Sequence, residues 1–106
     1  MPQPPSLTPE QRQAALDKAG KARRERAELK EKLKIGSVSL PEVLAQAENE
    51  DTVAKMKVQA VLESLPGVGK VRARRTMDEL GIADTRRIRG LGSQQREALL
   101  RAFPVR

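Results

Sequence analysis

The sequence lacks cysteine, histidine, tryptophan and tyrosine, and Phe103 is its only aromatic residue. Without cysteine, neither a disulfide nor a thiolate metal site can hold the fold together. Without histidine or cysteine, the usual nucleophile–base pairs and most metal chemistries have no residues to use. We therefore expect a modest core of aliphatic side chains, no cofactor or metal, and no catalytic residues.

Long apolar runs are also missing, since no stretch reaches the ~18–20 residues that span a bilayer. Residues 1–7 are rich in proline and contain neither the basic nor the apolar part of a signal peptide. We expect them to form a disordered tail. No membrane partner is expected, and the protein is expected to stay in the cytoplasm.

Basic residues are in excess, with 21 Lys and Arg against 14 Asp and Glu, a net charge of +7. Residues 1–34 carry 9 basic and 5 acidic side chains, residues 35–64 carry 2 and 5, and residues 65–106 carry 10 and 4. The two ends are therefore basic and the middle is acidic. This distribution favours an anionic partner, with nucleic acid the first candidate.

The sequence predicts a long basic N-terminal helix within residues 8–36. Thr8 as N-cap, Pro9 and Gln11 form a capping box, and the helix is expected to run to about Lys34. Only its second half offers leucines to a core, so the first half should project. Lys21, Arg23 and Arg24 belong to a basic face on this helix. That face is either simply solvated or makes secondary DNA contacts.

Residues 37–106 are predicted to form a second, all-α unit. Helices are expected at about 40–47, 51–64, 69–80 and 93–103, with a single turn at 85–89. The expected N-caps are Ser39, Asp51, Asp84 and Ser93. No segment alternates with period two, so no strand is predicted.

The stretch Leu65–Lys70 (LPGVGK) stands between two of these helices. Gly67 and Gly69 allow a tight hairpin whose backbone can approach a ligand closely. Gly69 also opens a helix, whose free N–H groups and positive dipole end favour a phosphate. Lys70 adds a positive charge, and Arg74 lies one turn further on. We therefore take Gly67, Val68, Gly69 and Lys70 as a candidate phosphate-binding turn.

A second, similar turn follows 23 residues later, where Ile88, Gly90, Leu91 and Gly92 fall on the positions of Leu65, Gly67, Val68 and Gly69. The alternative is that its glycines only make a sharp corner. Arg86, Arg87 and Arg89 precede this turn, and Ser93 follows it. We expect these arginines to face nucleic acid, on phosphates or in a groove.

The segments LPGVGKVRARRTMDELGI and TRRIRGLGSQQREALL, with the basic helix before them, resemble the actinobacterial integration host factor family. The resemblance implies a long N-terminal helix followed by a helix-two-turns-helix DNA-binding domain, which also looks like a small-subunit ribosomal protein. It implies a nucleoid-associated protein that binds duplex DNA with little sequence preference and bends or compacts it. It also implies support for site-specific recombination by a phage integrase in a nucleoprotein complex. A monomer is expected.

Three other functions remain open. One is a protein–protein adaptor, suggested by the acidic middle segment, but it leaves the net charge of +6 on residues 65–106 unexplained. Some helix-hairpin-helix proteins are DNA glycosylases with a lysine nucleophile in the hairpin and an aspartate further on, which Lys70 and Asp84 could supply. Such an enzyme stacks the extruded base in a pocket, and one phenylalanine builds little of one. An RNA-binding or ribosome-associated role is the more serious alternative, because phosphate contacts alone do not tell DNA from RNA. The scarcity of aromatic residues argues against binding by stacking on single strands.

Overall fold

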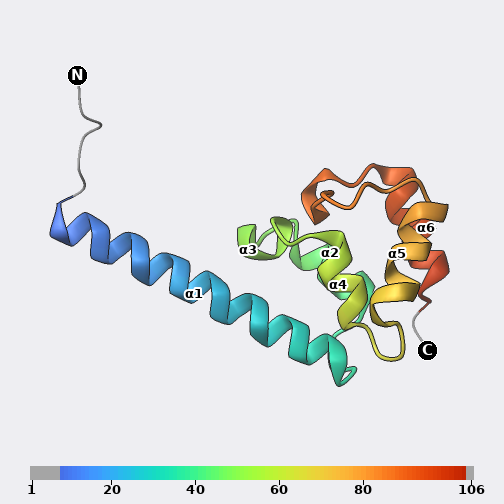
Figure 1. The fold of residues 1–106 in the computed structure, drawn as a ribbon, viewed down its shortest axis with the longest axis horizontal. Helices are drawn as coiled ribbons and strands as arrows, with labels where there is room; N and C mark the ends of the chain where they lie inside the picture. Colours follow the sequence, from blue (N-terminus) through green and yellow to red (C-terminus); the bar gives the residue numbers. More distant parts are fainter. Residues whose placement is uncertain (1–7, 105–106) are drawn as a thin grey trace.

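A computed structural model describes residues 8–104, so the predicted tail at 1–7 lies outside the described residues. The all-α prediction is confirmed, and the described residues contain no β-strand. The helices are α1 (Pro9–Lys34), α2 (Leu40–Gln46), α3 (Asp51–Ala54), α4 (Val58–Ser64), α5 (Gly69–Glu79) and α6 (Ser93–Ala102), with a 3₁₀ turn, η1, at Ile88–Gly90. Figure 1 shows α1 extending away from a body made by the other elements.

The predicted N-terminal helix is confirmed at both of its ends. The Thr8 N–H donates to Gln11 Oε1 at 3.0 Å, and the Gln11 N–H donates to Thr8 Oγ1 at 3.1 Å. Ile35 is the C-cap, and Gly36 follows it with a φ of 79°. At 26 residues, α1 is about 39 Å long.

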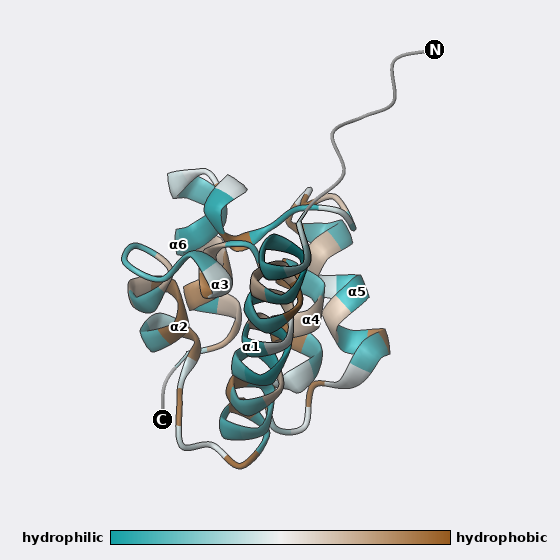
Figure 2. Cartoon of the chain, turned by 90° about the vertical axis from the view of Figure 1, so that its left-hand side faces the viewer, coloured by the Kyte–Doolittle hydropathy of each residue, from teal (hydrophilic) through white to brown (hydrophobic). Residues whose placement is uncertain are grey.

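The two halves of α1 differ as the sequence predicts, because its only buried residues are Leu29 and Leu33. Figure 2 shows the helix from outside as mainly hydrophilic. Its first half lies beyond the body, which explains a radius of gyration of 16.5 Å against about 13 Å for a compact chain of this length. The N-terminal half of α1 therefore owes its stability to local interactions alone.

The core gathers around α4, whose Val58, Val61 and Leu62 are fully buried. Leu33 of α1 and Met77 of α5 pack into the same cluster, as does Leu99 of α6. The core is aliphatic apart from methionine, as the composition predicts, and Phe103 packs only at its edge. α4 thus fixes the positions of the turns that precede and follow it.

The prediction of one helix from Asp51 to Ser64 is wrong. The structure divides it into α3 and α4, and Asp51 is not an N-cap, since Glu50 holds that position without a side-chain hydrogen bond. Met56 and Val58 bond instead to the distant segment 86–88: the Val58 N–H donates to the Arg86 carbonyl and the Ile88 N–H to the Met56 carbonyl, both at 2.9 Å. These long-range bonds replace the helical bonds that the break removes.

Of the other three predicted N-caps, Asp84 and Ser93 are wrong. Ser39 is an exception in part: it is the N-cap of α2, as predicted, but the expected capping box is absent, because its hydroxyl donates to Glu42 Oε1 at 3.0 Å and caps no N–H group. Asp84 caps no helix, because the turn forms later, at η1, with Arg87 before it. Ser93 is the first residue of α6, and Gly92 takes the N-cap position, where its N–H donates to Gln95 Oε1.

Candidate nucleic-acid interface

The predicted hairpin joins α4 to α5 as a tight turn. Gly67 and Gly69 have φ values of 74° and 69°, in the left-handed region that favours glycine. The Val68 N–H closes the turn on the Leu65 carbonyl at 3.2 Å, and the Val68 side chain is 9% exposed. Val68 therefore anchors the turn in the core, while the backbone of the two glycines stays at the surface.

The N-terminus of α5 is open to a ligand. Val68 is its N-cap and supplies no side-chain hydrogen bond. The N-terminus of α1, in contrast, is capped by the capping box of Thr8 and Gln11. The first N–H groups of a helix have no partner within the helix, and they carry the positive end of the helix dipole. Lys70 is exposed on the first turn. The geometry suits a phosphate oxygen.

Two further lysines, which the sequence analysis did not single out, lie beside the hairpin. Lys30 and Lys34 of α1 line a hollow of about 410 Å³ together with Gly69 and Lys70. Two acidic residues, Glu31 and Glu63, line it too, and the Glu63 carboxylate accepts a hydrogen bond from Gln59 Nε2 at 2.9 Å. The i,i+4 spacing of Lys30 and Lys34 is the signal that could have placed both on one face of the helix.

The second turn matches the first in part. The Leu91 N–H donates to the Ile88 carbonyl at 3.2 Å, the counterpart of the bond from Val68 to Leu65. Gly90 and Gly92 lack the positive φ of Gly67 and Gly69. The two turns are therefore related, as predicted, in that each leads into a helix, but the glycines of the second turn do not adopt the conformation of those in the first.

The three arginines before this turn have different surroundings. Arg86 Nη1 donates to the Gly90 carbonyl at 3.0 Å, which braces the turn. Arg87 Nη1 reaches across to the Lys55 carbonyl at 2.7 Å. Arg89 is exposed on η1. All three stay at the surface, but two of them also hold the local backbone.

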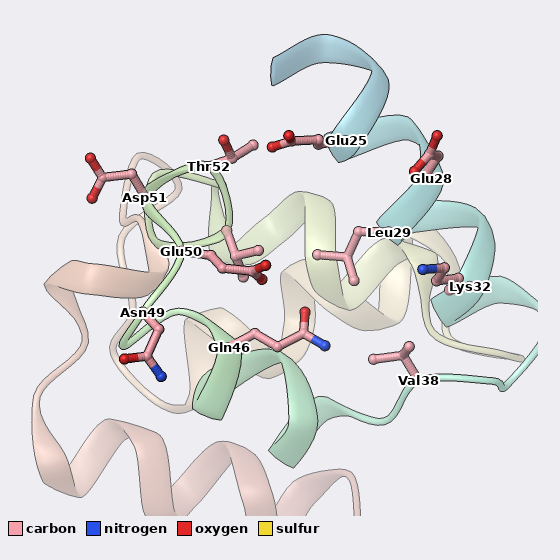
Figure 3. Close-up of a pocket in the computed structure, with 11 residues that line it drawn as sticks. Glu25, Glu28, Leu29, Lys32, Val38, Gln46, Asn49, Glu50, Asp51 and Thr52 are labelled. Atoms are coloured by element: carbon pink, nitrogen blue, oxygen red, sulfur yellow. The ribbon is translucent and has the colours of Figure 1, made fainter. Parts of the chain in front are cut away.

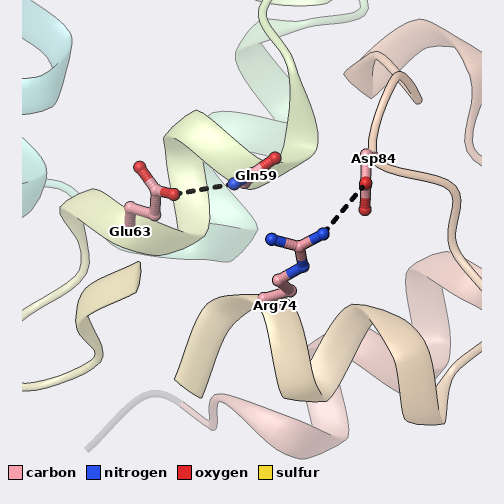
Figure 4. Close-up of polar contacts among 4 residues, drawn as sticks. All are labelled: Gln59, Glu63, Arg74 and Asp84. Carbon is pink, nitrogen blue, oxygen red and sulfur yellow. Dashed lines mark hydrogen bonds and ion pairs between the residues drawn. The ribbon is translucent and has the colours of Figure 1, made fainter. Parts of the chain in front are cut away.

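Arg74, expected beside Lys70 on α5, extends toward the loop that carries Asp84. The Arg74 Nη2 to Asp84 Oδ2 distance is 3.7 Å, with both side chains more than half exposed (Figure 4). A pair in this setting contributes little to stability. Arg74 can therefore exchange Asp84 for a phosphate at small cost.

The candidate secondary contacts lie on the projecting part of α1. Lys21 is 3.9 Å from Glu25, one turn further along, and Arg23 and Arg24 are exposed. Nothing in the body packs on these side chains, because the burial of α1 begins at Leu29. The structure thus places them well apart from the hairpin along the helix axis.

A larger hollow, of about 660 Å³, lies between α1 and the segment around α3. Figure 3 shows Glu25 and Glu28 at one side of it and Glu50 and Asp51 at the other, with Lys32 the single basic residue among those that line it. This acidic hollow repels a phosphate. The hairpin and the arginines remain the candidate surface for an anion.

Within residues 8–104, no group of three or more carboxylate, imidazole or thiol side chains is placed to hold a metal ion. No helix in this range has both the length and the apolar character to cross a membrane.

Comparison with known proteins places the chain in a family. Residues 33–103 match the model of the S13-like H2TH domain. The integration host factors of Streptomyces coelicolor and Mycobacterium tuberculosis are 61% and 60% identical to the chain over 99 residues, which is 93% of it and 92% and 94% of the two relatives. A solved structure of sIHF bound to an 8 bp palindromic DNA is 57% identical, with a TM-score of 0.80, and the match covers 82% of this chain and 98% of that one. The chain therefore belongs to the actinobacterial integration host factor family and carries its helix-two-turns-helix domain.

Proposed function

We propose that this protein binds duplex DNA through phosphate contacts, with little sequence preference. The observation that carries the proposal is the N-terminus of α5, which no side chain caps. The helix begins at Gly69, and Lys70 lies on its first turn. Arg74, Arg86, Arg87, Arg89 and Ser93 extend the contact set. A relative of 57% identity has been solved with DNA bound, which supports this choice of partner.

The proposed role is architectural: a nucleoid-associated protein of the cytoplasm that acts as a monomer, bends or compacts DNA, and supports integrase-mediated recombination. The part of α1 before its buried leucines supports this, because Lys21, Arg23 and Arg24 lie there and can hold a second stretch of duplex. Two separated basic surfaces on one chain can bring two segments of DNA together. The name shared by the curated relatives supports the link to integration.

Catalysis is not part of the proposal. Asp84, the aspartate of the glycosylase hypothesis, contacts Arg74. Phe103, the one aromatic residue, lies under the guanidinium of Arg72, with Cζ 5.5 Å from the ring centre. A base-flipping enzyme needs an aromatic or apolar pocket for the extruded base, and Phe103 is already occupied.

RNA binding is the alternative to test, since an S13-like domain and phosphate contacts are compatible with it. The experiment is competition for the protein between a labelled duplex DNA and a structured RNA of equal length at fixed salt. We expect unlabelled duplex DNA to displace the probe at lower concentration than the RNA. Preferential displacement by RNA would refute the DNA assignment.

A further inference from the structure

Five cations form a cluster on two chain segments that meet beside the break between α3 and α4: Lys55 and Lys57 at the break, Arg86 and Arg87 just before η1, and Arg89 on η1. The ranges 55–57 and 86–89 contain no acidic residue. In the described part of the chain, none of these five cations lies within 4.0 Å of a carboxylate oxygen. The positive charge of this cluster is therefore not neutralised by the protein.

Lys57 and Arg87 stand directly opposite each other in this cluster. They form an isolated antiparallel bridge, and the hydrogen bonds on either side of it join their neighbours. In such a pair the side chains lie on the same face, with Cβ atoms roughly 4.5–5.5 Å apart. Like charges in this arrangement repel each other.

Arg87 is also held in place. Its Nη1 donates to the Lys55 carbonyl at 2.7 Å, and a guanidinium has further N–H donors to offer a ligand. A long side chain that is already fixed loses less conformational freedom when it binds. The bridge thus presents a fixed guanidinium beside an exposed ammonium.

We propose that Lys57 and Arg87 form a clamp for one phosphate of the bound DNA, an inference that rests on the proposed function. A phosphate between the two cations relieves their repulsion and accepts charge-assisted hydrogen bonds from both. The clamp lies at the N-terminal end of α4 and the hairpin at its C-terminal end. Seven residues of helix separate them by about 10 Å, which is on the order of a DNA groove width.

The test compares Lys57→Gln with Lys32→Gln, in duplex DNA binding across a salt series and in thermal unfolding without DNA. Lys32 lines the acidic hollow, so its variant removes the same charge from a face that repels DNA. We expect Lys57→Gln to reduce the slope of log affinity against log salt by about 1, a loss of roughly 8-fold at 0.1 M salt. Its Tm should stay level or rise, because the repulsion is gone. Lys32→Gln should leave the slope unchanged.

Lys57→Arg keeps the charge and should keep the wild-type slope. If log affinity depends on log salt concentration with the same slope for Lys57→Gln as for Lys32→Gln, the proposed clamp is refuted. A lower Tm together with weaker binding that Lys57→Arg does not restore would refute it too, because that pattern marks a structural residue. If the wild-type protein itself fails to bind duplex DNA, the proposed function fails; if the wild type binds and only Lys57→Gln is neutral, the clamp alone fails.

Discussion

Substitution of Gly69 by alanine, compared with a matched control, distinguishes the effect of a strained backbone on stability from the effect of the hairpin on DNA affinity. Gly69 and Gly81 stand at opposite ends of α5, and both have a φ of 69°. An added Cβ would meet no neighbouring atom within 4 Å at either position. Gly81→Ala is therefore a matched control, with the same backbone strain and no place in the hairpin.

The stability effects of the two variants should be nearly equal. An L-residue in the left-handed region costs about 1–2 kcal/mol, which lowers the Tm of a domain of this size by roughly 5–15 °C. The binding effects should differ. If the Cβ introduced by Gly69→Ala displaces a phosphate from the amides at the start of α5, one charge-assisted contact worth about 1.5–3 kcal/mol is lost, or about 10- to 100-fold in affinity.

The assay is fluorescence anisotropy with a labelled duplex, at a temperature where circular dichroism shows both variants folded. We expect Gly69→Ala to bind about 10- to 100-fold more weakly than the wild type and Gly81→Ala to bind as the wild type does. Equal affinities for the two variants would refute the reasoning that the open amides of α5 contact the DNA.

Two further predictions concern α1. Leu33 is fully buried, so Leu33→Ala should lower the free energy of unfolding by about 2–5 kcal/mol, measured by urea denaturation; a loss below about 1 kcal/mol would contradict the docking of α1 in the core. Deletion of residues 1–24 removes Lys21, Arg23 and Arg24 but keeps Leu29 and Leu33. It should reduce DNA compaction, measured by single-molecule extension, more than it reduces affinity for a short duplex; unchanged compaction would contradict the second surface.

The features set by local chemistry could be predicted from the sequence. The capping box at Thr8 predicted where α1 begins, and Leu29 and Leu33 predicted which part of it packs on the core. The spacing of Gly67 and Gly69 predicted the hairpin. Each of these signals lies within a few neighbouring residues. The same is true of Gly81, which ends α5 as expected for a C′ glycine.

The features set by distant residues could not be predicted in this way. The break between α3 and α4 depends on hydrogen bonds to residues 86 and 88, which lie far along the chain. Because the sequence predicts one continuous helix here, it gives no indication that Lys57 pairs with Arg87. The conformation of the second turn could not be predicted for a related reason. Gly90 and Gly92 repeat the glycine spacing of the first turn but do not adopt its positive φ values.

The salt dependence of duplex DNA binding by the wild-type protein tests the central claim most directly. If the hairpin and the basic residues around it neutralise about six phosphates, the slope of log affinity against log salt concentration is about −5. A slope shallower than about −2 would contradict an interface built on phosphate contacts.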